Sequence, residues 1–289
     1  MPRSHSVSSL DGKVCIVTGA NTGIGYIAAL EMARAGAHVV LTCRTAEKGA
    51  PVVERIQQET GNPKVECLPM ELGNLSKVKA AAEEFLAKDL PLDILLNNAG
   101  LAGQRGQTDD GFEIQFGVNH MGPALFTRLL DGKLRESAPA RVVFVASRAH
   151  IRAKNGVDLN VVQQSTPSTA GFDEYSVSKL ANVLYSRKLA DHFKGSGVTT
   201  YALHPGVVAT DVWRRIPSIF RWIPKLFMIT PEQGAQTSLY CCTEPSIAAD
   251  TGLYYDDCAE RKPNRFALDD DGMNALWDKT EEWLAPYLS

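Results

Sequence analysis

A glycine-rich turn between an apolar run and a helical pattern constrains the fold of this chain more than any other stretch. Residues 13–18 form a short β-type run, and Gly19, Gly23 and Gly25 follow it with the spacing G-x-x-x-G-x-G. A helical pattern then continues over residues 24–35. Strand, glycine turn and helix in this order are typical of a dinucleotide-binding unit, in which the helix N-terminus stabilises a pyrophosphate. Because glycines also serve ordinary turns, the flanking strand and helix carry this interpretation.

Strand-like and helix-like stretches alternate along the rest of the chain. Further strands are expected at 37–42, 64–70, 92–96, 141–145, 198–203 and 252–255, and helices at 46–59, 76–87, 112–134, 174–193, 231–241 and 271–285. This alternation predicts an α/β fold, a Rossmann-type doubly wound parallel sheet with helices on both faces. No internal repeat or linker divides the sequence, so we expect a single domain over residues 1–289. Ser76 is expected to cap its helix.

Charge and cysteine content bear on the class of protein. The net charge of −3, with scattered basic residues, leaves no electrostatic footprint for nucleic acid. Six cysteines without a C-x-x-C pair favour reduced, mostly buried thiols, and no metal site is expected. The first twelve residues are polar, and no apolar run approaches the roughly 20 residues that span a bilayer. We therefore expect a cytoplasmic protein without a signal peptide or transmembrane segment.

The residues after the second strand bear on cofactor choice. An acidic side chain about 20 residues past the glycines binds the ribose of NAD, whereas a nearby arginine suits the 2′-phosphate of NADP. No Asp or Glu lies between Val39 and Ala46, and Arg44 falls within that stretch. Arg44 is the predicted phosphate ligand, with a plain surface arginine as the alternative. NADP(H) is therefore favoured, and NAD(H) stays open.

Tyr175 and Lys179 lie four residues apart in the expected helix 174–193, so their side chains share one helix face. An ammonium beneath a phenol favours the phenolate, and we expect the pKa of Tyr175 to fall from about 10 toward neutrality. A phenol with such a pKa can give and take a proton near physiological pH. Taken alone, Tyr-x-x-x-Lys occurs by chance in many helices, and a solvated surface pair is the alternative.

Small and amide residues follow two other expected strands. Residues 97–100 read Asn-Asn-Ala-Gly, and Ser147 comes two residues after the strand 141–145. The carboxyl ends of parallel strands border the crevice in which open α/β sheets bind ligands. Asn119 stands in the middle of the expected helix 112–134, where asparagine is unfavourable, so it should bond something specific. The next residue, His120, is interpreted as a satisfied core or interface histidine rather than a catalytic one.

Together, and in this order, the motifs resemble the signature set of the short-chain dehydrogenase/reductase family. They are T-G-x-x-x-G-x-G from Thr18, N-N-A-G from Asn97, Asn119, Ser147, Y-x-x-x-K from Tyr175 and P-G from Pro205. The resemblance covers roughly residues 11–255. Five stretches, 20–25, 110–113, 137–141, 178–184 and 197–201, look like the retinol dehydrogenase-like branch, which includes the oxidoreductase module of WW-domain oxidoreductases.

The resemblance assigns site residues. Asn119, Ser147, Tyr175 and Lys179 would be catalytic. The cofactor-binding residues would be Gly19, Asn21, Thr22, Gly23, Ile24, Gly25, Arg44, Glu71, Leu72, Asn98, Ala99, Gly100, Tyr175, Lys179, Pro205, Gly206, Val208 and Thr210. Two positions depart from the family pattern: Glu71 replaces the usual aspartate that faces the adenine, and Ala146 replaces the first of two serines. Several vertebrate members carry an N-terminal membrane anchor, which we expect this chain to lack.

The resemblance also implies a reaction, the interconversion of a carbonyl compound and its alcohol by hydride transfer. Tyr175 would donate the proton, and Ser147 would hydrogen-bond the substrate oxygen. Lys179 would lower the tyrosine pKa and hold the nicotinamide ribose, Asn119 would support a water relay, and Thr210 would contact the carboxamide. The alternatives are a catalytically silent dinucleotide-binding scaffold or sensor on the same fold and, disfavoured by its glycine spacing, a sugar-nucleotide epimerase.

The segment at about 211–230 resembles the substrate-covering loop of the family. Large apolar residues and cations alternate in it, and Pro217 and Pro224 divide it into short pieces, as expected of a lid. The apolar side chains would line the pocket, while the arginines would face water or anionic headgroups. We expect a lipophilic aldehyde, ketone or alcohol as substrate, with weak peripheral membrane contact. A homo-oligomer is compatible with this reading.

Overall fold

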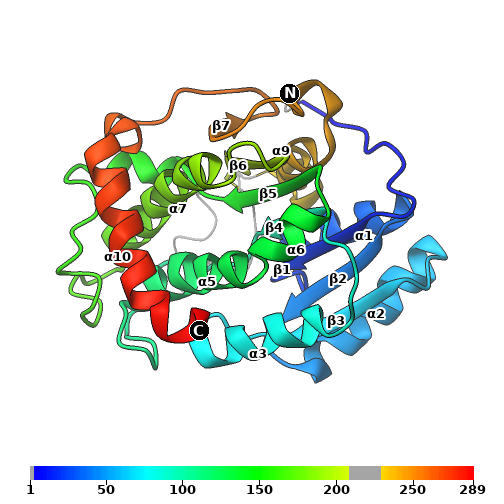
Figure 1. Cartoon of the computed structure of the whole chain (residues 1–289), viewed down its shortest axis with the longest axis horizontal. Coiled ribbons are helices and arrows are strands. Elements are labelled where there is room, and N and C mark those ends of the chain that lie inside the picture. The colour runs from blue at the N-terminus through cyan, green and yellow to red at the C-terminus, as the bar shows by residue number, and fades with distance from the viewer. Residues whose placement is uncertain (1–2, 208–228) are drawn as a thin grey trace.

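Seven parallel strands form the centre of the molecule, with helices on both faces (Figure 1). The computed structural model describes residues 3–207 and 229–289. The strand order is β3-β2-β1-β4-β5-β6-β7, and every pairing between neighbours is parallel. The strands are β1 (Val14–Thr18), β2 (His38–Cys43), β3 (Val65–Pro69), β4 (Ile94–Asn97), β5 (Ala140–Val145), β6 (Val198–His204) and β7 (Leu253–Asp256). The predicted doubly wound α/β fold is confirmed.

The strands are apolar because both faces of the sheet are covered. Every residue of β1 is buried, as is every residue of β2 except the first, His38. Parallel sheets with helices on both sides require such continuous apolar strands. The strand order reverses between β1 and β4, and this switch point is where open α/β sheets bind ligands.

The helices divide into two layers, each with its own part of the hydrophobic core. Helices α3, α5, α7 and α10 pack on one face, and α1, α2 and α9 on the other. The helices are α1 (Gly23–Arg34), α2 (Ala46–Thr60), α3 (Leu75–Leu86), α4 (Ile114–Phe116), the π-helix η1 (Gly117–Met121), α5 (Gly122–Leu129), α6 (Asp131–Glu136), α7 (Phe172–His192), α9 (Pro231–Thr243) and α10 (Asp270–Leu288). Short 3₁₀ turns are η2 (Arg148–Arg152), η5 (Pro245–Ile247) and η6 (Arg265–Leu268).

The regular helix expected at 112–134 is not a single α-helix, so this prediction was wrong in detail. The segment is made up of α4, the π-helix η1, α5 and α6. Pro123 has no N–H to donate to the carbonyl four residues earlier, that of Asn119, so the regular ladder cannot continue there. A Cβ on Gly122 would lie 2.5 Å from the Leu72 carbonyl oxygen, so close packing also shapes this turn. Asn119 thus lies in a π-turn, a feature frequent at functional sites.

The predicted cap of α3 was also wrong. The helix begins at Leu75, and the side chain of Asn74 accepts a hydrogen bond from the Lys77 N–H at 3.0 Å. A cap must precede the first helical residue, so Ser76 is already too far along the helix to serve.

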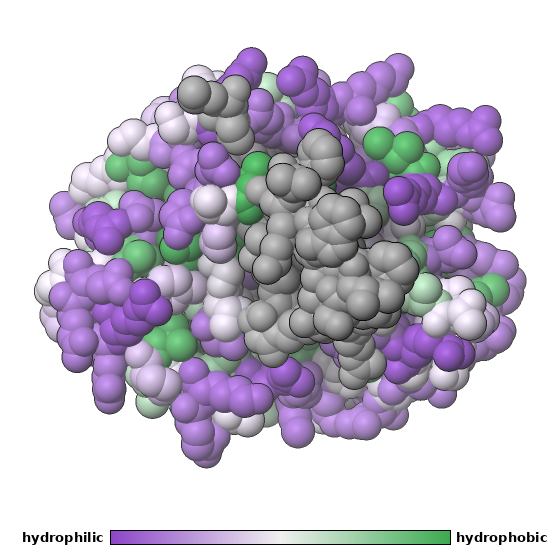
Figure 2. Space-filling view, turned by 180° about the vertical axis from the view of Figure 1, so that it is seen from behind, coloured by the Kyte–Doolittle hydropathy of each residue, from purple (hydrophilic) through white to green (hydrophobic). Residues whose placement is uncertain are grey.

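Hydrophilic residues predominate on the face seen in Figure 2, with hydrophobic residues scattered among them. Across residues 3–207 and 229–289, no helix has both the length and the apolar character to cross a bilayer. In the same part of the chain, no three His, Cys, Asp or Glu side chains gather as a metal site would require. All six cysteines are free thiols, and all except Cys67 are buried.

Candidate active site

The glycine turn after β1 packs directly against the Asn-Asn-Ala-Gly stretch after β4. The N–H groups of Asn98 and Ala99 both donate to the Thr18 hydroxyl at 2.9 Å. Gly19 has φ +65°, and a Cβ there would lie 2.8 Å from that of Ala99. A Cβ on Gly25 would collide with the Asn98 amide and lie 2.6 Å from the Gly19 carbonyl oxygen. Glycine is therefore required at both positions, and the two motifs form one structure at the switch point.

The first turn of α1 is available to an anion. Thr22 precedes the helix, and its side chain makes no capping hydrogen bond. Asn21 and Thr22 are exposed, while Gly23 and Ile24 are half-buried. The first N–H groups of a helix have no partner within the helix and favour a phosphate group. The turn therefore fits the pyrophosphate of a dinucleotide.

Arg44 lies at the carboxyl end of β2, where the adenosine end of such a cofactor would reach. Its side chain is exposed and forms no ion pair within residues 3–207 and 229–289. Thr45 precedes α2, again without a side-chain cap, so a second helix N-terminus lies beside the arginine. Glu71 and Leu72 follow the neighbouring strand β3, half-buried and buried respectively. The predicted residues for the adenosine end thus follow two adjacent strands.

Helix α7 brings Tyr175 and Lys179 to the carboxyl end of β5. The Lys179 ammonium donates to the carbonyl of Val145, the last residue of β5, at 2.7 Å and lies 5.7 Å from the centre of the Tyr175 ring. Ser147, two residues beyond β5, hydrogen-bonds the Tyr175 hydroxyl through its side chain. Three of the four predicted catalytic residues therefore meet, although Ser147 and Tyr175 belong to different elements.

Asn119, the fourth predicted catalytic residue, lies next to this group. Its amide nitrogen donates to the Leu101 carbonyl and to the Ser178 hydroxyl, both at 2.9 Å, and its amide oxygen accepts from the Leu101 N–H at 2.8 Å. A Cβ on Gly100 would lie 3.1 Å from the Asn119 amide oxygen and 3.3 Å from Lys179 Nζ. The expectation that Asn119 bonds something specific is confirmed, and Gly100 lies close to both Asn119 and Lys179.

The expected fall in the pKa of Tyr175 was wrong for this structure. Burial raises the pKa of the Tyr175 phenol, and the hydrogen bond from Ser147 opposes that rise only in part. Burial lowers the pKa of Lys179 to about 8. The lysine points at a carbonyl oxygen rather than at the phenol oxygen, and no anion lies beside it in the described part of the chain. Loss of hydration therefore outweighs the attraction between the two side chains.

The Pro205-Gly206 motif follows β6 at the same edge of the sheet, and both residues are half-buried. Val208, Thr210 and most of the predicted lid at 211–230 lie outside the described residues. On the far side of that gap, the Ile229 N–H donates to the Val207 carbonyl at 2.9 Å.

Three histidines lie near the candidate active site, and their roles differ. His120 is fully buried between the rings of Phe116 and Tyr185, and burial lowers its pKa to about 3, which confirms it as a core histidine. His150 and His204 contact the backbone beside Ser147, a role that sequence reasoning missed. The available signal was the position of His204 at a strand end, directly before Pro205-Gly206.

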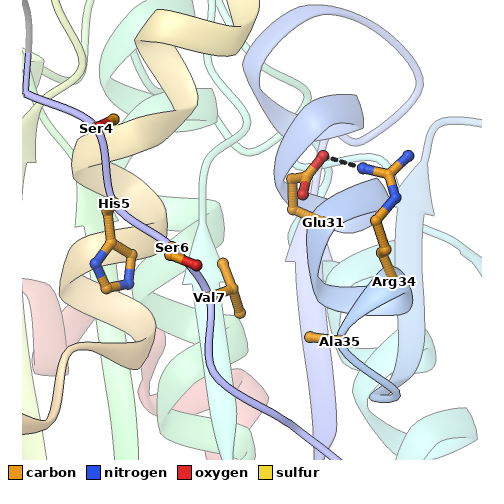
Figure 3. A pocket seen from close by; sticks show the side chains of 7 residues that line it. All are labelled: Ser4, His5, Ser6, Val7, Glu31, Arg34 and Ala35. Carbon is orange, nitrogen blue, oxygen red and sulfur yellow. Dashed lines mark hydrogen bonds and ion pairs between the residues drawn. The ribbon is translucent and has the colours of Figure 1, made fainter.

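A cavity of about 390 Å³ lies beside Arg148, His204 and Gly206, at the carboxyl end of β6. A slightly larger cavity of about 430 Å³ lies elsewhere, between residues 4–7 and the part of α1 that carries the ion pair of Glu31 and Arg34 (Figure 3). It contains none of the predicted site residues. Size alone therefore does not mark the functional site, whereas convergence of reactive side chains does.

A model of the short chain dehydrogenase family matches residues 13–218. The chain belongs to the short-chain dehydrogenase family. Retinol dehydrogenase 11 of Homo sapiens is 43% identical to this short-chain dehydrogenase over 277 residues, which cover 94% of this chain and 86% of that protein. The predicted retinol dehydrogenase-like branch is confirmed.

Solved structures agree with this family. The Pseudomonas aeruginosa RhlG/NADP active-site complex matches with a TM-score of 0.68 and 25% identity, over 91% of this chain and 100% of that one. The 3-ketoacyl-(acyl-carrier-protein) reductase of Brucella melitensis, complexed with NADH, matches with a TM-score of 0.66 and 27% identity, over 86% and 97%. This short-chain dehydrogenase is accordingly an oxidoreductase with a nicotinamide dinucleotide cofactor, for which the glycine turn and α1 provide a fitting site.

Proposed function

We propose that this short-chain dehydrogenase uses NADP(H) to interconvert a lipophilic aldehyde or ketone and its alcohol. The observation that carries the proposal is the meeting of Ser147, Tyr175 and Lys179 at the carboxyl end of β5. That edge of the sheet also carries the glycine turn, where the cofactor fits. The nicotinamide supplies or accepts the hydride.

The residues of the protein handle the charge on the substrate oxygen. As a carbonyl is reduced, its oxygen becomes negative, and the Tyr175 hydroxyl gives it a proton. The Ser147 oxygen already accepts from the Ala149 N–H at 3.1 Å, which leaves the serine's own hydrogen to donate to the tyrosine or the substrate. Lys179 would contact the nicotinamide ribose on the side that Gly100 leaves open, and Asn119 would support a water relay.

Arg44 supports the preference for NADP(H). It is exposed, unpaired within the described residues and not accompanied by an acid at the end of β2. A guanidinium can bind a phosphate through two parallel charge-assisted hydrogen bonds. The structural relatives include complexes with NADP and with NADH, so the preference for NADP(H) is proposed on the basis of Arg44.

Two observations support a lipophilic substrate. The relative named retinol dehydrogenase 11 is named for an apolar alcohol. The sequence at 211–230 alternates large apolar residues with cations, as a lid over an apolar pocket would. A single domain over residues 1–289, this lid, weak membrane contact, a homo-oligomer and a cytoplasmic location remain predictions from the sequence.

The test is turnover of NADPH with aldehydes and ketones of rising apolar size, in the wild type, in Tyr175→Phe and in Tyr185→Phe. We expect kcat/KM to rise with apolar size, and Tyr175→Phe to lose about 10²–10⁴-fold in kcat with cofactor binding nearly intact. Tyr185 is the matched control, since it lies buried on the same helix and its hydroxyl has no hydrogen-bond partner in the described structure.

Three outcomes would count against the proposal. Best turnover of small polar carbonyls would refute the lipophilic substrate. Equal activity of the two phenylalanine variants would refute the role of Tyr175. Tight NADPH binding without turnover of any carbonyl would instead favour the silent scaffold.

A further inference from the structure

The peptide group that joins Ser147 to Arg148 is held at both of its polar atoms by histidine side chains. Nδ1 of His150, in η2, lies 2.6 Å from the Ser147 carbonyl oxygen. The Arg148 N–H donates to Nδ1 of His204, the last residue of β6, at 3.2 Å. The carbonyl and the N–H belong to one planar unit, so two contacts fix the orientation of the whole plane.

These contacts assign opposite tautomers to the two rings. Because the Ser147 carbonyl can only accept, His150 carries its proton on Nδ1, and its Nε2 accepts from the Asn264 N–H at 3.3 Å. His204 accepts on Nδ1 and therefore carries its proton on Nε2. Both rings must be neutral for all of these hydrogen bonds to exist.

The surroundings keep both rings neutral and in place. His150 and His204 are only 1% and 4% exposed, and burial lowers the pKa of both, that of His204 to about 4. The charged and titratable groups that face His204 are Asp256, Arg148 and His150, and the first two form an ion pair at 2.6 Å. The His150 ring packs edge-on against Tyr254, and its backbone carbonyl accepts from the Asn264 amide at 2.8 Å.

We propose that His150 and His204 are positioning residues. By hydrogen-bonding the two polar atoms of the peptide group after Ser147, they orient the Ser147 hydroxyl toward Tyr175. The dihedral angle ψ of Ser147, 153°, relates that plane to the serine Cα–Cβ bond. A plane fixed to the end of β6 therefore fixes the direction of the Cα–Cβ bond, and the Ala149 N–H, which donates to the serine oxygen at 3.1 Å, holds the hydroxyl on that bond. This inference rests on the proposed function, in which Ser147 bonds the substrate oxygen and Tyr175.

The test compares asparagine and leucine at each histidine. An asparagine amide can occupy the place of Nδ1, where its oxygen accepts from the Arg148 N–H in His204→Asn and its nitrogen donates to the Ser147 carbonyl in His150→Asn. Misplacing a catalytic group by about 1 Å can cost about 10²-fold, so we expect the leucine variants to lose roughly 10- to 100-fold in kcat. Cofactor Kd should stay unchanged, and the asparagine variants should recover most of the loss.

His5→Leu is the matched control. His5 is a largely buried histidine that bonds the Thr243 hydroxyl of α9 at 2.7 Å, and none of its hydrogen bonds in the described structure reaches Ser147 or Arg148. Its loss should lower thermal stability without lowering kcat. If His5→Leu lowers kcat as much as the other leucine variants do at equal loss of stability, the effect is merely structural and the proposal fails.

A double variant separates positioning from independent action. In a Ser147→Ala background, His204→Leu should cause no further loss of kcat, because the histidine acts through the serine. The proposal would be overturned if the losses of kcat from the two changes multiplied in the double variant. It would also be overturned if the asparagine variants had no higher kcat than the leucine variants. If Ser147→Ala keeps wild-type kcat, the assumed role of Ser147 fails and the positioning role fails with it.

Nitrogen NMR of the imidazole rings tests the two histidine hydrogen bonds without any measurement of turnover. The wild-type protein should show His150 protonated on Nδ1 and His204 on Nε2. If both rings carry the same tautomer while Ser147→Ala still lowers kcat, the positioning role of the two histidines is refuted and the proposed function stands.

Discussion

Loss of hydration controls the charge of Lys179, which lies 3% exposed at the end of β5. Its ammonium has a carbonyl oxygen as a hydrogen-bond acceptor and no carboxylate beside it in the described structure. Burial therefore lowers the pKa of this lysine to about 8, and below that pH the folded protein carries a buried charge. The same desolvation raises the pKa of Tyr175 above its ordinary value of 10.0, so the pKa values of the two groups move apart, because burial disfavours the charged form of each.

The first prediction concerns stability against pH. Between pH 8 and 10.5 the folded state has released the Lys179 proton while the unfolded state still binds it, so this residue makes stability rise with pH. The contribution is on the order of 3 kcal/mol. Lys179→Met should be more stable than the wild type below pH 8 and should lack this rise. Urea unfolding of both proteins across that range is the measurement, and parallel pH curves would contradict it.

The second prediction concerns cofactor choice at Arg44. Arg44→Ala should raise KM for NADPH by about 10- to 100-fold and change KM for NADH little, because only NADPH carries the 2′-phosphate. Arg55→Ala is the matched control, since Arg55 is also exposed, on the neighbouring helix α2, and pairs with Glu59 at 2.7 Å. An equal rise of KM for both cofactors in Arg44→Ala would refute the assignment.

At the scale of elements, the start of α1 packs against the end of β4 at the proposed dinucleotide site. Thr18, Gly19 and Asn98 form a hydrogen-bonded junction there, and Gly25 has no room for a side chain. The glycine turn is thus a packing requirement as well as the proposed phosphate site.

The third prediction follows from that junction. Gly25→Ala should push α1 away from Asn98 and raise the Kd for NADPH at least about tenfold, which corresponds to roughly 1.4 kcal/mol. Gly132→Ala in α6 is the control, because a Cβ there meets nothing within 4 Å. That change should leave binding unaltered and stabilise the helix by up to about 1 kcal/mol. Unchanged binding in Gly25→Ala would show that the junction tolerates displacement.

At the scale of the whole molecule, the C-terminal helix α10 completes the core on which α7 rests. It packs against α7 and α5, and Leu276 and Leu284 belong to the same buried cluster as Leu180 of α7. The helix that carries Tyr175 and Lys179 is therefore held by the last residues of the chain.

The fourth prediction tests this dependence. Leu284 is fully buried, and Leu284→Ala should lower the free energy of unfolding by about 2–5 kcal/mol. Leu268, which is 40% exposed, is the control, and Leu268→Ala should cost no more than roughly 0.5 kcal/mol. Denaturant midpoints of the two variants provide the comparison, and equal midpoints would mean that α10 contributes little to the core.

Local sequence patterns were sufficient to predict much of the fold of this protein. The strand, glycine turn and helix at residues 13–35, the apolar strands and the four-residue spacing of Tyr175 and Lys179 each depend on neighbours in the chain. Backbone periodicity and chirality fix such features without knowledge of the rest of the fold. The doubly wound sheet followed from their alternation.

Contacts between distant residues were decided only by the tertiary structure. The π-turn at Asn119 depends on Pro123 and on packing against Leu72, and the pKa of Tyr175 depends on burial that no spacing reveals. The contact of His204 with Arg148 joins residues 56 positions apart in the sequence. Desolvation and hydrogen-bond geometry are set by what surrounds a group in space, so the sequence alone could place these residues at the sheet edge but not state what each one touches.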